Sequence, residues 1–257
     1  MRKDSYYENF IIAFQRGAHM DLSKTKKVTW ILFCLLLFAP FFIERNIISR
    51  ITFPNGTLRQ PQDVWGTIHF IYCYIAYGTA CLLYYKWQKK LGMRMSVKPA
   101  NSDVKWLVLV AVTGIFVSRF TSLALGFGFL SPPMPLGEFR NYLSFEPLWT
   151  GIVGLFMQYI YYVFEFALAA FIVDCGHKTS IRLGWLQKIP WGGILLALTW
   201  RLTHPTIGLF TSSPINFYAA ISGFMLALTT GFAYMLPCKK NIKHIYAFIM
   251  VMAWYWF

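Results

Sequence analysis

The sequence predicts an all-α, polytopic membrane protein, built as a bundle of about seven transmembrane helices. Of its 257 residues, 57% are hydrophobic and only 13% are charged, about half the roughly 25% of charged residues in soluble domains. Several apolar stretches exceed the roughly 18 residues that are typical of a membrane-spanning helix. The lysine and arginine residues lie mostly between these stretches, where they act as topology signals. These observations exclude a soluble globular fold and a disordered chain.

The N-terminal segment, residues 1–27, is too polar to cross a membrane. It is basic, and its aromatic and aliphatic residues recur at helical spacing, which predicts an amphipathic helix on the inner membrane surface. That stripe consists of Tyr6, Tyr7, Phe10, Ile11 and Phe14. We therefore expect a cytoplasmic basic amphipathic segment over 1–27 and a transmembrane helical domain over 28–257.

Seven apolar runs follow in that domain, and each predicts one helix. Between the third and fourth runs, the proline-rich stretch 131–135 predicts a loop without helix. The runs are 28–43, 64–85, 105–125, 151–174, 191–212, 214–236 and 242–257.

The basic residues alternate between the segments that separate these runs. One set of alternate segments carries 18 Lys and Arg residues and the other carries 4. By the positive-inside rule, the richer set faces the cytoplasm, so the N-terminus is predicted to be cytoplasmic. The net charge of +14 is therefore attributed to topology and anionic lipid contacts, and no nucleic-acid partner is expected.

Four ionisable residues fall inside the predicted spans: Arg119, Glu165, Arg201 and His204. Charged groups at membrane mid-depth are costly, and they commonly mark a functional site or a structural ion pair. Glu165 and His204 are predicted to lie within about one helical turn of the same depth. Arg201 precedes His204 by three residues and shares its helix face. His69 lies near the start of a span, where contact with water would account for it.

Three interpretations of these residues remain open. Glu165 could form a buried structural ion pair with Arg201 or Arg119. Alternatively, Glu165 and His204 could hold a water molecule, with Glu165 as general base and His204 orienting the attacked carbonyl. A transporter that uses Glu165 as a proton or cation site is a third possibility.

Other chemistries lack a recognisable motif. We find no HExxH pair and no cluster at metal-ligand spacing, so neither a metal site nor a cofactor is expected. No GxSxG turn is present. The five cysteines lie in or beside apolar runs, which is typical of small core residues.

The C-terminal part of the chain, about 151–257, resembles the CAAX-protease and bacteriocin-processing family of intramembrane glutamic proteases, also called the abortive-infection family. Members carry Glu-Glu-x-x-x-Arg in one span and Phe-x-x-x-His about forty residues later. Here Phe164-Glu165-Phe166 stands at the first motif and Trp200-Arg201-Leu202-Thr203-His204 at the second. The stretch Gly231–Leu236 is similar to the family's glycine-bearing span. The second motif Glu, the motif Arg and the last His and Asn are absent at the matching positions.

The resemblance implies a divergent, metal-independent intramembrane endopeptidase in which Glu165 and His204 activate a water, with Arg201 or Arg119 as charge partner or substrate-orienting residue. The alternative is a non-catalytic relative that acts as an immunity or scaffolding protein for a membrane partner such as an exporter, a sensor kinase or a peptide. In either case the expected contacts are membrane lipids and a membrane-associated peptide or protein. The expected location is a bacterial plasma membrane, crossed several times.

Overall fold

The computed structural model describes residues 26–52, 64–91, 101–124, 134–201, 214–236 and 241–256. The predicted interfacial helix within the first 27 residues lies outside these ranges, as does His204. Every regular element in the described ranges is a helix, so the predicted all-helical fold class is confirmed.

The helices follow the apolar runs closely. In the N-terminal half they are α2 (Lys27–Ile43), which continues through a π-helical segment η2 (Glu44–Ile48) into α3 (Ser49–Thr52), α4 (Val64–Lys90), α5 (Asn101–Ala124) and α6 (Met134–Leu143). In the C-terminal half they are α7 (Leu148–Leu183), α8 (Trp191–Leu196) with its π-helical continuation η3 (Ala197–Arg201), α10 (Pro214–Met235) and α11 (Ile242–Trp256).

Three of the described helices are long and apolar enough to cross a membrane. They cover Lys27–Ile48, Gly66–Lys90 and Leu148–Leu183. Shorter apolar helices cover Gly223–Met235 and Ile242–Trp254. These lengths and compositions are those of a membrane protein, because the hydrocarbon core of a bilayer needs about 20 apolar residues of helix.

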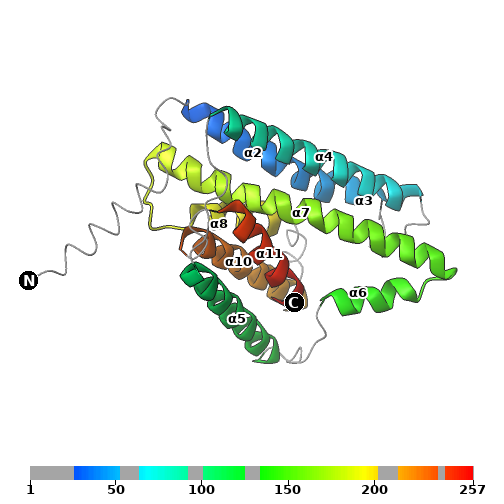
Figure 1. Ribbon diagram of the computed structural model, residues 1–257. Helices are drawn as coiled ribbons and strands as arrows, with labels where there is room; N and C mark the ends of the chain where they lie inside the picture. The colour runs from blue at the N-terminus through cyan, green and yellow to red at the C-terminus, as the bar shows by residue number, and fades with distance from the viewer. Residues whose placement is uncertain are drawn as a thin grey trace, which may run out of the picture.

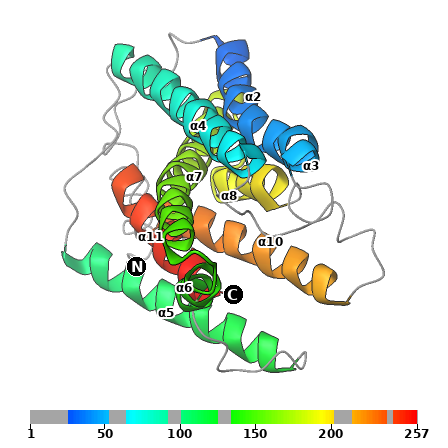
Figure 2. The same ribbon diagram turned by 90° about the vertical axis from the view of Figure 1, so that its right-hand side faces the viewer.

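Helix α7 is the central element of the bundle. It runs across the middle of the molecule, with α2 and α4 along one side and α8, α10 and α11 along the other (Figure 1). Seen along α7, these helices surround it, and α5 lies outermost beyond α10 and α11 (Figure 2). The contacts agree, since α7 packs against α2, α4, α6, α8, α10 and α11. The buried side chains of α7 are therefore positioned to meet partners from several parts of the chain.

Two helix boundaries differ from the predictions. Helix α6 begins at Met134, inside the stretch predicted to be loop, because Pro135 falls in its first turn, where a missing N–H costs nothing. Helix α7 continues nine residues beyond the predicted end at 174 and ends at Leu183. It then stops at Gly184, whose φ of 76° closes the helix in the left-handed conformation.

Glycines allow α7, α8 and α10 to approach closely. A Cβ on Gly192 of α8 would lie 2.1 Å from the carbonyl oxygen of Val173 on α7, and a Cβ on Gly193 would lie 2.8 Å from Cα of Gly231 on α10. Such backbone contact between helices is typical of membrane bundles, in which small residues bring helix axes together. Helix α8 is therefore held firmly against the second half of α7.

The outward faces of the bundle are strongly apolar. Exposed large hydrophobic side chains lie along α2, α4, α5 and the first half of α7, among them Leu35, Ile75, Phe120 and Phe156. In contrast, carboxylates, a lysine, histidines and glutamines are buried inside. An apolar outside around a partly polar inside fits a lipid environment, since exposed apolar surface of this extent is rare on soluble monomers.

Candidate functional site

Glu165 lies midway along α7 and is buried, with 4% of its surface exposed. Tyr162 precedes it by three residues and so shares its face of the helix. Across the helix interface, Tyr77 reaches the same region from α4, and both phenols are within electrostatic range of the Glu165 carboxyl group. The sequence prediction of a buried acidic group at the middle of this helix is therefore confirmed in its position.

The surroundings of Glu165 continue into a polar contact with α6. The Tyr162 hydroxyl donates a hydrogen bond to Glu138. One turn back on α7, Gln158 accepts a hydrogen bond from Tyr142 at 3.4 Å. Burial of these groups in one place requires that they satisfy one another, because an unpaired polar group inside a protein costs about 1–3 kcal/mol. Glu165 thus belongs to a polar region rather than to a purely apolar helix face.

The backbone of η3, which ends at Arg201, is positioned by the packing of α8 against α7. The close contact of Gly192 with Val173 fixes the register of α8–η3 against α7. If both segments continue antiparallel, the nine residues from Gly192 to Arg201 bring the backbone of Arg201 to about the level of Glu165. The side chains of Arg201 and His204 lie outside the described part of the structure, so the predicted pairing of each with Glu165 stays a prediction.

Arg119 is also buried, with 9% of its surface exposed. It lies on α5, which packs against α10 and α11. Charged residues within membrane-spanning helices generally face the interior of the bundle or water, and the burial of Arg119 fits that rule. Its predicted role as a charge partner of Glu165 remains a prediction.

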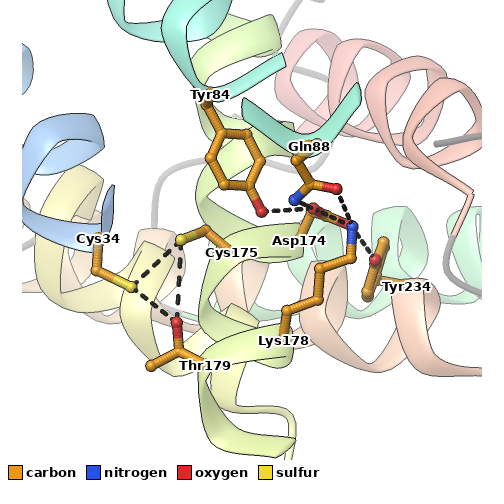
Figure 3. A network of polar contacts seen from close by, with 8 residues as sticks. All are labelled: Cys34, Tyr84, Gln88, Asp174, Cys175, Lys178, Thr179 and Tyr234. Atoms are coloured by element: carbon orange, nitrogen blue, oxygen red, sulfur yellow. Dashed lines mark hydrogen bonds and ion pairs between the residues drawn. The ribbon is translucent and has the colours of Figure 1, made fainter. Parts of the chain in front are cut away.

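The sequence analysis missed a second polar cluster, which is centred on Asp174 of α7 (Figure 3). The Asp174 Oδ2 atom accepts hydrogen bonds from the Tyr84 hydroxyl at 2.7 Å and from Gln88 Nε2 at 2.9 Å. It also forms an ion pair with Lys178 Nζ at 2.8 Å, while Oδ1 accepts from Tyr234 of α10. Lys178 in turn donates to Gln88 Oε1 at 2.5 Å.

This cluster, the Asp174 network, joins three helices. Asp174 is 1% exposed and Lys178 is 3% exposed, so both charged groups lie in the interior of the protein. Beside the network, Cys34 of α2 lies 3.4 Å from Cys175 Sγ and 3.3 Å from Thr179 Oγ1 (Figure 3). The i,i+4 spacing of Asp174 and Lys178 was the signal that could have revealed an intrahelical pair.

A third cluster lies where η2 meets α4. Glu44 Oε1 is 3.0 Å from His69 Nε2, and Glu44 Oε2 accepts a hydrogen bond from the Tyr77 hydroxyl at 2.7 Å. Cys73 lies one turn beyond His69 on α4, and the ligating atoms of Glu44, His69 and Cys73 all lie within 4.8 Å of one another. His69 is fully buried, so the prediction that water contact accounts for it is wrong.

This Glu44 cluster carries residue types that bind transition metals, contrary to the expectation that no such group exists. His69 and Cys73 are four residues apart on one helix, and that spacing was the available signal. Its third member, Glu44, directly follows a different apolar run, and only the packing of α2 and η2 against α4 brings it near.

Comparisons with known proteins were made against family models, curated proteins and solved structures. None of the three finds a match for this chain. The resemblance to the CAAX-protease and bacteriocin-processing family therefore rests on the residues around Glu165 and His204 and on the later glycine-bearing span.

Proposed function

We propose that this protein is a divergent intramembrane peptidase of the CAAX-protease and bacteriocin-processing type. In this proposal the seven apolar runs cross a bacterial plasma membrane, the N-terminus is cytoplasmic, and Glu165 is the general base. The observation that carries the proposal is the burial of Glu165 at the middle of the central apolar helix. A carboxylate at this position in a membrane is energetically costly, and such residues commonly belong to a functional site.

Each residue has a defined role in the proposed reaction. Glu165 accepts a proton from a water molecule, and the resulting hydroxide attacks the carbonyl carbon of a membrane-associated peptide. His204 polarises the carbonyl oxygen as negative charge develops on it. Glu165 then returns the proton to the leaving amine. Arg201 or Arg119 orients the substrate or balances the charge of Glu165.

Two structural features support this assignment. The register of α8–η3 against α7 brings the backbone of Arg201, which precedes His204 by three residues, to about the level of Glu165. The phenols of Tyr77 and Tyr162 near Glu165 supply hydrogen-bonding groups in a region that would have to hold water. A purely apolar surrounding would hold none.

The decisive experiment is the variant Glu165→Gln, which keeps size and hydrogen-bonding capacity and removes basicity. The protein is co-expressed with membrane-associated peptides encoded beside its gene, and cleavage is followed by mass spectrometry. We expect folded Glu165→Gln protein whose cleavage rate is lower by roughly 10²–10⁴-fold. His204→Ala should act in the same direction. Glu146→Gln, at an exposed glutamate just before α7, is the matched control and should cleave normally.

The same experiment tests the alternative function. If stable Glu165→Gln protein retains the complete biological phenotype, hydrolysis by Glu165 is not what the protein does. The non-catalytic role, immunity or scaffolding for a membrane partner, then takes its place. A structural ion pair is distinguished by stability, because Glu165→Gln would then unfold at a lower temperature than the wild type.

A further inference from the structure

We propose that Glu44, His69 and Cys73 form a binding site for a divalent transition metal ion of the zinc type, which would join η2 to α4. This inference does not require the proposed peptidase function, because none of the three ligands is assigned a role in that reaction, although Tyr77 lies near both Glu44 and Glu165. The distances between the three ligand atoms, their chemistry and the complete burial of the three residues support a metal site.

The distances suit a tetrahedral ion. Zinc binds imidazole nitrogen at about 2.0–2.1 Å, carboxylate oxygen at about 2.0–2.2 Å and thiolate sulfur at about 2.3 Å. In a tetrahedron these lengths place the ligand atoms about 3.4–3.6 Å apart. The Glu44–His69 separation of 3.0 Å is close to that value, and no pair exceeds 4.8 Å. Side-chain rotations that move the ligand atoms by about 1 Å would complete the tetrahedral geometry and leave a fourth position for water or another ligand.

The charges suit a dication. A Glu44 carboxylate and a Cys73 thiolate with a neutral imidazole carry two negative charges, which a divalent ion balances. Binding therefore displaces the thiol proton to solvent. The mixture of nitrogen, oxygen and sulfur favours a borderline-soft ion such as Zn²⁺ over Mg²⁺ or Ca²⁺, which prefer oxygen ligands alone.

The helices around the three residues hold them in position. Ser49 donates its backbone N–H to the carbonyl of Glu44, five residues back, and such π-turns inside helices frequently occur at functional sites. The Tyr77 hydroxyl fixes the second oxygen of Glu44, as outer groups around a metal commonly fix a ligating carboxylate. Close by, Tyr72 donates to the carbonyl of Pro40 at 3.2 Å and ties α4 to α2.

The test begins with wild-type protein purified in detergent, stripped with a chelator and dialysed against Zn²⁺ or Co²⁺. We expect about one equivalent of ion per chain to remain, and the Co²⁺ form should show a thiolate-to-cobalt charge-transfer band and the intense visible bands of tetrahedral cobalt. Zinc should also raise the unfolding temperature. Failure to retain any ion, or a Co²⁺ spectrum without thiolate ligation, would overturn the proposal.

Variants then assign the ligands. Cys73→Ser should abolish the charge-transfer band, and Cys81→Ser, at a buried cysteine two turns further along α4, is the matched control that should keep it. Tyr77→Phe leaves all three ligands and should weaken zinc binding by about 10–100-fold. If Cys73→Ser does not fold, Cys34→Ser takes its place: an unchanged spectrum supports the site, and loss of the band in Cys34→Ser or Cys81→Ser refutes it.

Discussion

The Asp174 network and the Glu44 cluster both include residues of α4, but they differ in how the negative charge of the buried carboxylate is balanced. Asp174 is neutralised by Lys178, an ammonium group on its own helix, and receives three further hydrogen bonds from Tyr84, Gln88 and Tyr234. Glu44 lies instead against the imidazole of His69, and the thiol of Cys73 is within 4.8 Å of its carboxylate. The Asp174 network contains its own cation, the ammonium group of Lys178, whereas the Glu44 cluster contains groups that can bind a metal cation together.

This difference indicates different roles for the two clusters. A closed network, in which every member has partners, makes a helix bundle rigid and specifies its packing. The Asp174 network ties α4, α7 and α10 together in this way, so we interpret it as structural. The Glu44 cluster combines metal-ligating residue types on two helices, so an added ion can change its stability. The predictions below separate the two roles.

The largest effect is expected from Lys178→Met, which leaves the Asp174 carboxylate buried without its ammonium partner. Loss of one member of a buried pair costs about 3–5 kcal/mol, so little folded protein should be recovered, as measured by thermal unfolding in detergent. Asp174→Asn combined with Lys178→Met should restore more than half of that loss. Lys188→Met, at an exposed lysine in the loop before α8, serves as control. Equal losses in the single and double variants would contradict the closed-network interpretation.

A smaller effect is expected from a methyl group added at Gly192, beside the Asp174 network. Its Cβ would meet the Val173 backbone at 2.1 Å, and backbone cannot move aside without separating α7 from α8. Overpacking of this kind typically costs 1–3 kcal/mol, and Gly192→Ala should lower the unfolding temperature accordingly. Gly78→Ala, next to Tyr77, would meet only the Phe164 ring at 3.2 Å. That ring can turn, so the free energy of unfolding should change by less than about 1 kcal/mol. A larger loss of stability in Gly78→Ala than in Gly192→Ala would contradict this prediction.

The smallest effect distinguishes the clusters most directly. Tyr84→Phe removes one of several donors to Asp174 and should cost about 1–1.5 kcal/mol in thermal unfolding, with zinc affinity unchanged. Tyr77→Phe should lower zinc affinity, as proposed above. Both quantities are measured on each variant, by calorimetric unfolding and by competition with a chromophoric chelator. A zinc affinity that falls in both variants would show that the two clusters are coupled.

Much of the fold could be predicted because apolar helices of a membrane protein are local features. Each of the seven apolar runs overlaps a described helix, and the fifth run is described only as far as Arg201. The positions at which the helices begin and end were less predictable from the sequence. Residues 175–180 look polar in the sequence, but they continue α7 because Lys178 pairs with Asp174 inside the bundle. Likewise, Pro135 marks the beginning of α6 and not the absence of a helix.

Of the buried polar groups, the sequence predicted only those that a single residue makes recognisable. A carboxylate in an apolar run identified Glu165 as buried, and the structure confirms that burial. The Asp174 network and the Glu44 cluster were missed, because their members come from separate segments of the chain, which in the Asp174 network are up to 150 residues apart, from Tyr84 to Tyr234. Spacings such as Asp174 to Lys178 and His69 to Cys73 are visible in the sequence, but many i,i+4 pairs occur on helices by chance.

The sequence by itself determined the all-helical class and the buried position of Glu165, because both follow from the cost of exposing polar groups to lipid. It also predicted the approximate helix positions through the length of each apolar run. Only the tertiary structure decided which polar groups meet. The glycine contacts at Gly192 and Gly193 set the approach of α7, α8 and α10, and the packing of α2 against α4 brought Glu44 to His69. Such meetings depend on helix rotation and register, which the spacing of residues within a single helix does not fix.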